Sequence, residues 1–137
     1  MGRVFFNTRK NVVSLDAAYV VLPSDSGTTF VLNAAAGVAI TLPSVANMQT
    51  GWNCRFIVGT AFSSSNWQIT ATAAVVKAGA NELEINDGTD MPSTVGGTTI
   101  DFVHSLETLG DYVDLECDGT SIFMRGQSKL DGSILLA

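Results

Sequence analysis

Hydrophobic and polar residues alternate with a period of two along most of the chain, which is the pattern of β-strands with one buried face. In Tyr112–Cys117, for example, valine, leucine and cysteine fall on one face, and tyrosine and two acids fall on the other. This alternation predicts strands at Arg3–Phe6, Ala18–Leu22, Thr28–Asn33, Val38–Leu42, Asn53–Val58, Trp67–Thr72, Leu83–Ile85, Thr98–Val103, Tyr112–Cys117, Ser121–Arg125 and Ile134–Leu136.

Clusters of Gly, Asn, Asp and Ser separate these strands, and Asp118-Gly119 has the composition of a tight hairpin turn. Many short strands with such turns predict an all-β fold, a single antiparallel β-sandwich or barrel of jelly-roll-like type. The best helical candidate, Ala71–Ala80, is short and contains β-branched residues. The segment Ala73–Gly97 is the least regular, and we expect a long loop or a protruding hairpin there. The chain shows no repeat of fixed period, so the sequence does not support a propeller or solenoid.

Length and composition fit one globular domain. The chain has 137 residues, of which 46% are hydrophobic and only 15% are charged. A surface so poor in charge is common where copies of the same chain or a partner cover it.

The charges are distributed unevenly. Arg3, Arg9 and Lys10 lie among the first ten residues, which contain no acid, although the whole chain has a net charge of −6. We therefore divide the chain into an extended N-terminal arm, residues 1–17, and a β-domain, residues 18–137. The acidic body has no basic stripe, which argues against a nucleic-acid partner.

No apolar run is long enough to span a membrane, and the N-terminus lacks the apolar region of a signal peptide. Cys54 and Cys117 each lie in an apolar alternating run, without the spacing of a zinc site. Two buried free thiols are favoured over a disulfide. We expect no metal and no cofactor.

The residue types of catalytic sites are present but do not form a known motif. His104 is the single histidine, and Asp101, Ser105, Glu107 and Asp111 are close to it in sequence. A lone histidine at a strand end is more often structural, and no nucleophile elbow occurs. We therefore expect no enzyme.

Two acidic regions were considered as cation sites. Asn86–Asp90 has calcium-type ligands but not the order of an EF-hand loop, so a plain turn is favoured. The densest acidic cluster consists of Asp111, Asp114, Glu116 and Asp118, and it fits a solvated face or a patch for a basic arm better than a chelating site.

A carbohydrate groove would need clustered aromatic residues. Trp67 follows a serine-rich turn, so it could contact sugar or protein at a loop tip. The other interpretation, an anchor in the hydrophobic core, is favoured.

The two ends of the chain are the best candidates for contacts with other molecules. Val4, Phe5 and Phe6 put three large apolar residues inside the basic arm. Ordering such an arm gains little unless it docks on something. The apolar residues Ile134, Leu135 and Leu136, almost at the other end, are expected to be covered by the chain's own body or by a neighbouring subunit.

Two stretches resemble a module that recurs in virion proteins of tailed bacteriophages. Asp25–Val58 contains S-G-T-T-F-V-L, then A-I-T-L-P, then F-I-V, similar to successive strands of that module. Gly110–Gly126 is similar to its last hairpin, with Ile122-Phe123 where the module usually has an aromatic residue, often Trp.

This resemblance implies an all-β, often trimeric, virion structural domain. The chain's length suits a capsid decoration (cement) protein on the outside of the head. Its partners would be the major capsid protein, through Arg3, Val4, Phe5, Phe6, Arg9 and Lys10, and further copies of itself, through Ile134, Leu135 and Leu136. It would be made in the host cytoplasm. The alternatives are a tail or fibre-tip attachment protein that binds a host surface glycan and, more remotely, a small hydrolase or lectin-like accessory protein.

Overall fold

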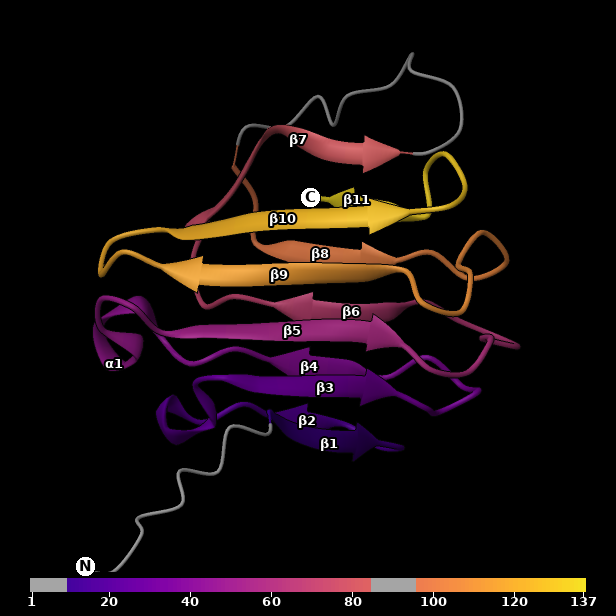
Figure 1. Ribbon diagram of the computed structural model, residues 1–137, viewed down its shortest axis with the longest axis horizontal. Coiled ribbons are helices and arrows are strands. Elements are labelled where there is room, and N and C mark those ends of the chain that lie inside the picture. The colour runs from indigo at the N-terminus through magenta and orange to yellow at the C-terminus, as the bar shows by residue number, and fades with distance from the viewer. Residues whose placement is uncertain (1–9, 85–95) are drawn as a thin grey trace, which may run out of the picture.

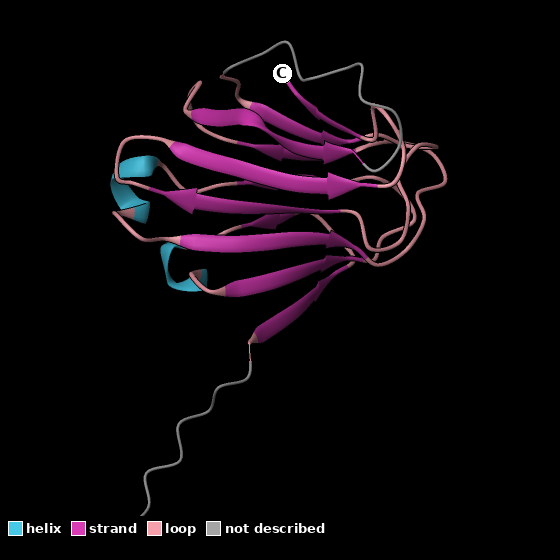
Figure 2. Cartoon of the chain, turned by 45° about the horizontal axis from the view of Figure 1, so that its top comes forward, coloured by secondary structure: helices cyan, strands magenta, loops and turns pink. Residues whose placement is uncertain are grey.

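Two β-sheets face each other across one hydrophobic core (Figures 1 and 2). The computed structural model describes residues 10–84 and 96–137, and for residues 78–84 only the backbone. The six-stranded sheet has the order β1-β3-β5-β9-β10-β7 and the five-stranded sheet the order β11-β8-β6-β4-β2. The elements are β1 Asn11–Leu15, β2 Tyr19–Val20, η1 Pro23–Asp25, β3 Thr28–Leu32, β4 Ala39–Thr41, α1 Val45–Met48, β5 Asn53–Val58, β6 Trp67–Thr70, β7 Val76–Glu84, β8 Thr99–Phe102, β9 Tyr112–Cys117, β10 Ile122–Ser128 and β11 Ile134–Leu136.

The predicted all-β sandwich is confirmed, and the alternative of a closed barrel is not, because both sheets are open. The strand pairing differs from the antiparallel, jelly-roll-like arrangement that we expected. β1, β3 and β5 are parallel neighbours in one sheet, and β2, β4 and β6 are parallel neighbours in the other.

This parallel half is built from three two-strand coils. The chain passes from one sheet to the other after every strand from β1 to β6, so each coil adds one strand to both sheets. The coils are unequal in length: paired residues are 17 positions apart between β1 and β3 (Asn11 and Thr28) but 26 apart between β3 and β5 (Thr28 and Cys54). A solenoid is recognised in a sequence by a repeat of fixed length. The loops of these coils differ in length, so the coiled arrangement leaves no such repeat in the sequence.

Antiparallel pairing continues the six-stranded sheet through β9 and β10 and completes the five-stranded sheet through β8 and β11. β9 pairs with β5 on one side and with β10 on the other. The β9–β10 turn is the predicted Asp118-Gly119 hairpin, in which Gly119 has φ +93° and Asp118 Oδ1 accepts the backbone N–H groups of Thr120 and Ser121, both at 2.7 Å. A side chain at such a φ would be strained, so glycine suits this turn.

Two strands lie where the sequence analysis expected other structure. β1 falls inside the segment 1–17 that we set apart as an arm, and it pairs with β3 over its whole length. β7 occupies part of Ala73–Gly97, where a loop or hairpin was expected, and it lies parallel to β10 at the sheet edge. It replaces the end of the helical candidate Ala71–Ala80 with strand, and its last two residues overlap the strand predicted at Leu83–Ile85. The strand predicted at Arg3–Phe6 lies outside the described residues.

The core consists of the inward-facing residues of both sheets. The rings of Phe30 and Phe56, on neighbouring strands, are stacked with centroids 5.1 Å apart, and Tyr19 packs against Phe30. Trp67 is fully buried and its Nε1 donates to the carbonyl of Ala34 at 3.1 Å. The interpretation of Trp67 as a core anchor is therefore confirmed.

Candidate docking surfaces

The outer face of the six-stranded sheet, which we call the charged face, carries an ion pair at its centre. Arg55 on β5 and Asp114 on β9 are register partners. Arg55 Nε lies 2.6 Å from Asp114 Oδ1, and Nη2 lies 2.8 Å from Oδ2, so the pair is bidentate. The guanidinium also lies 4.4 Å above the ring of Tyr112. The hydrogen bonding with Asp114 raises the pKa of Arg55.

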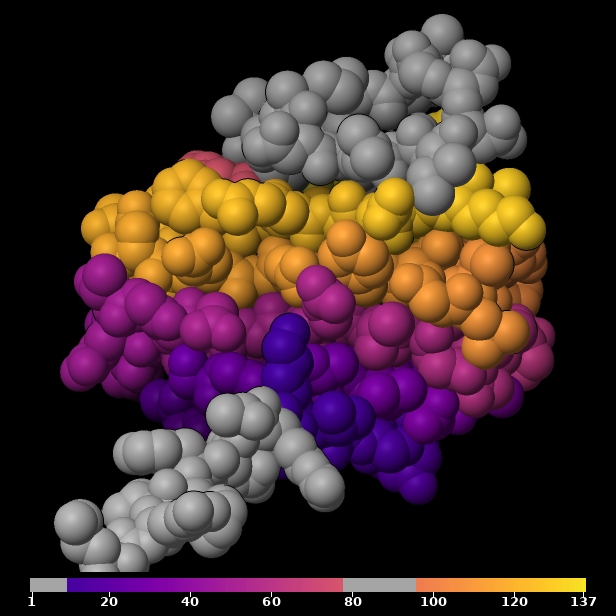
Figure 3. Space-filling view, in the orientation of Figure 1, coloured from indigo at the N-terminus to yellow at the C-terminus, as the bar shows by residue number. Residues whose placement is uncertain are grey.

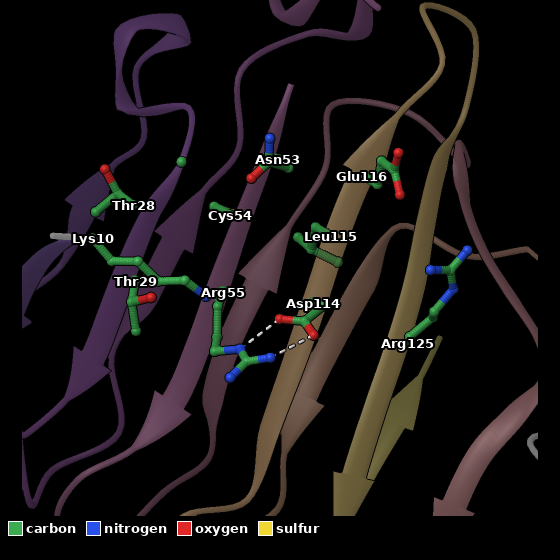
Figure 4. Close-up of a pocket in the computed structure, with 11 residues that line it drawn as sticks. Lys10, Thr28, Thr29, Asn53, Cys54, Arg55, Asp114, Leu115, Glu116 and Arg125 are labelled. Atoms are coloured by element: carbon green, nitrogen blue, oxygen red, sulfur yellow. Dashed lines mark hydrogen bonds and ion pairs between the residues drawn. The ribbon is translucent and has the colours of Figure 1, made fainter. Parts of the chain in front are cut away.

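A shallow groove of about 370 Å³ crosses the charged face around this pair (Figure 4). Lys10 lines the groove from the β1 side, and Glu116 and Arg125 line it from β9 and β10. These three charged side chains have no ion-pair partner within the described parts of the chain. Figure 3 looks onto this face, where the surface runs from indigo at β1 to yellow at β10. The groove thus offers charges of both signs to another molecule.

The outer face of the five-stranded sheet, which we call the neutral face, is different. Of the residues in its five strands only Asp101 is charged, and its Oδ1 accepts a hydrogen bond from Gln68 Nε2 at 2.9 Å. The other outward positions are small, polar or aliphatic: Val20, Ala39, Thr41, Thr70, Thr99 and Leu135. Such a face costs little to desolvate.

The residues of the arm are only partly described. Lys10 is exposed and lies directly before β1. Arg3, Val4, Phe5, Phe6 and Arg9 lie outside the described residues.

The apolar C-terminal residues form β11, which pairs with β8. Ile134 and Leu136 are buried in the chain's own core, with 1% and 6% of their surface exposed, whereas Leu135 is 47% exposed on the neutral face. The last residue is held in place, since the Ala137 carbonyl accepts N–H bonds from Thr98 and Thr99. The expected subunit contact is therefore narrowed to Leu135, because the chain itself covers the other two.

The residues around His104 do not gather into a catalytic arrangement. Ser105 Oγ lies 3.0 Å from His104 Nδ1. The neighbouring acids are bonded elsewhere: Asp101 to Gln68, and Glu107 Oε1 to a backbone N–H of the loop after β5.

Asp111 is buried and organises two loops. Its Oδ2 accepts the N–H of Thr108 at 2.8 Å and the hydroxyl of Ser133 at 3.3 Å, and its Oδ1 accepts the N–H of Lys129 at 3.0 Å. These bonds replace the water that a buried carboxylate loses, and they link the loop before β9 to the loop after β10.

The remaining acids of the predicted cluster have separate roles. Asp114 pairs with Arg55, Glu116 lines the groove, and Asp118 holds the hairpin turn. No group of three metal-ligating side chains occurs among the described residues, and Asn86–Asp90 lies outside them.

Both cysteines are free and buried in the core, as predicted. Burial raises the pKa of the Cys54 thiol, which disfavours the reactive thiolate.

The pairing of Arg55 with Asp114 cannot be inferred from the sequence pattern. The alternation placed each residue on the outer side of its strand, but the two are 59 positions apart and only the order of the strands brings them together.

Comparison with known proteins does not assign the chain: no family model, curated protein or solved structure matches it. No helix in the described parts of the chain has the length and apolar character needed to cross a membrane.

Proposed function

We propose that this chain is a non-enzymatic capsid decoration protein of a tailed bacteriophage, which binds the outer surface of the assembled head and stabilises contacts between capsid subunits. The observation that carries the proposal is where the two virion-like stretches lie. Asp25–Val58 contains β3, β4 and β5, and Gly110–Gly126 contains β9 and most of β10. β3, β5, β9 and β10 form a block of consecutive strands in the six-stranded sheet, with β5 paired to β9, whereas β4 lies in the five-stranded sheet.

The adjacency of these stretches supports the resemblance. A chance likeness in two separate stretches has no reason to produce neighbouring strands, whereas a shared module requires it. The inward-facing residues of this block, Phe30, Phe56, Val113 and Leu115, are all buried in the core that it shares with the five-stranded sheet.

The proposed mechanism is stabilisation by binding. A protein that binds only the assembled shell lowers the free energy of that state by mass action. The basic arm with Arg3, Arg9 and Lys10 would bind an acidic surface of the major capsid protein, and Val4, Phe5 and Phe6 would add apolar contacts or strand pairing.

The neutral face supplies the second proposed contact. Copies of a chain with a net charge of −6 repel one another, and this repulsion is weakest where the facing surfaces carry few charges. We therefore place the self-association expected of a homotrimer at this face, with Val20 and Leu135 as exposed apolar residues. The protein would reside on the capsid exterior, without a nucleic-acid or membrane partner.

The test is binding to shells that lack the protein. We expect deletion of residues 1–10 to weaken co-sedimentation with expanded shells, while the unfolding temperature stays close to that of the intact chain. Charge removal at Arg3 and Arg9 together is the finer variant. Its control, Lys129→Ala, removes an exposed charge after β10. An arm-deleted chain that decorates shells as tightly as the intact chain would refute the role of the arm.

A further inference from the structure

The first coil leaves one end of the sandwich uncovered. Within the described residues, β1 is the last strand of the six-stranded sheet and β2 the last strand of the five-stranded sheet (Figure 1). Three of the large hydrophobic residues that are most exposed lie in or beside these strands: Val12 at 60%, Val20 at 63% and Leu22 at 50%. An open strand edge flanked by apolar side chains is a site for pairing with another strand.

β1 lacks the charges, proline and bulge that commonly protect an edge strand, and no other described segment pairs with its open side. Its sequence, Asn11-Val-Val-Ser-Leu15, contains no charge and no proline, and it pairs with β3 in regular register without a bulge. β7, at the opposite edge of the same sheet, contains charged residues and a register shift against β10. The two edges of this sheet are therefore not equivalent, and β1 is the one suited to pairing.

The hydrogen bonding of β1 shows which backbone groups are available. The carbonyl of Leu15 accepts the N–H of Asn33, the residue that follows β3, at 2.8 Å. Because bonding direction alternates along a parallel strand, residues of odd number in β1 bond to β3. The N–H and C=O groups of Val12 and Ser14 therefore point to the open edge.

The charged residues at the two ends of β1 favour pairing with a second β1 strand. Lys10 precedes the strand and Asp16 follows it; both are exposed and neither has an ion-pair partner within the described residues. In an antiparallel pair of two β1 strands centred on Val13, Lys10 of each copy lies opposite Asp16 of the other. The same register sets Val12 opposite Ser14, and these are the residues whose backbone groups are available for a hydrogen-bonded pair.

We propose that β1 pairs with β1 of a second copy of this chain, antiparallel and across a two-fold axis centred on Val13. The contact is isologous, since both copies contribute the same edge. It joins the two six-stranded sheets edge to edge and brings Val12 of each copy toward the symmetry axis. It uses neither the neutral face nor Arg3–Arg9, and it does not depend on the proposed function.

Reversing the charges tests both the contact and its register. Lys10→Asp sets acid against acid in both pairs of a homodimer, and Asp16→Lys sets base against base. We expect each variant alone to associate roughly tenfold more weakly than the unaltered chain, measured by sedimentation velocity at low salt. An equimolar mixture of the two variants restores opposite charges in both pairs, so association should return. Lys129→Asp is the matched control and should change nothing.

A backbone variant tests the strand pairing itself. Val12→Pro removes an N–H that faces the open edge and is not needed for pairing with β3, so the fold should be kept. We expect thermal unfolding close to that of the unaltered chain, with loss of the association. Val12→Thr, which keeps the N–H, should retain it.

Three results would overturn the proposal. The first is a chain 1–137 that stays free of β1-dependent association at the highest concentration tested. The second is a mixture of charge-reversed variants that associates no better than either alone. The third is association that appears only when the chain begins at Lys10, which would show that residues 1–9 occupy the edge instead.

Discussion

The two outer faces of the sandwich cover one core but differ in charge. The charged face presents Arg55, Asp114, Glu116 and Arg125, whereas the strands under the neutral face contain a single charged residue, Asp101. The alternation that buries every second residue is the same in both sheets, so the core does not impose this difference. It shows that outward positions are free to differ, and that the neutral face is the one on which copies of an acidic chain approach each other with least repulsion.

The largest effect should come from the core beneath both faces. Phe30→Ala removes a fully buried ring that stacks on Phe56, and we expect a loss of about 3–5 kcal/mol of unfolding free energy. Thr29→Ala, the next residue along β3 and outward-facing, is the control and should cost far less. Denaturation in urea measures both. Similar losses would show that the faces, and not the common core, hold the sheets together.

A charge placed on the neutral face should affect association more than stability. Thr41→Lys puts a cation on an exposed position of β4, and Asn53→Lys does the same on the six-stranded sheet. We expect unfolding free energies within about 0.5 kcal/mol of the unaltered chain for both variants. Self-association, measured by sedimentation velocity, should weaken roughly tenfold for Thr41→Lys and less for Asn53→Lys. The reverse order would assign docking to the charged face.

The ion pair should contribute little to stability despite its good geometry. Arg55 and Asp114 have side chains that are 35% and 42% exposed, so water screens their attraction. A double-mutant cycle with Arg55→Met and Asp114→Asn should give a coupling of at most about 1 kcal/mol, decreasing with added salt. A matched cycle on Gln68 and Asp101 should give less. A salt-independent coupling would contradict this account.

The smallest expected effect is on the pH dependence of stability. Backbone N–H groups of Ser121 and Thr120 hold the pKa of Asp118 below its ordinary value. Because the folded pKa is the lower one, this carboxylate stabilises the fold at neutral pH, and its contribution is lost as the pH falls below about 4. Asp118→Asn should therefore unfold with less dependence on pH in that range. Thr41→Ala, an exposed substitution that removes no titratable group, should keep the full dependence.

The sequence predicted what is decided locally. β5 and β9 have the predicted bounds because buried positions alternate along both, although Ile57 puts a hydrophobic residue at an outward position of β5. The Asp118-Gly119 turn was predictable because its conformation depends on the turn residues themselves.

What depends on distant partners was not predicted. The parallel coils were not predicted because the spacing between paired residues changes from coil to coil. Only the end of β7 was predicted, by the strand expected at Leu83–Ile85, because the run of alanine and glycine at Ala78–Ala80 lacks a strand pattern and pairing with β10 stabilises it as a strand. The charged face is a product of the strand order, which alternation alone does not reveal.

The central claim, a decoration protein on the phage head, is tested most directly by counting copies. Quantitative mass spectrometry of purified virions, relative to the major capsid protein, gives the number of copies per particle. The account predicts hundreds of copies. A few dozen or fewer would place the protein on the tail and favour an attachment role, and absence from the particle would contradict any structural role in the virion.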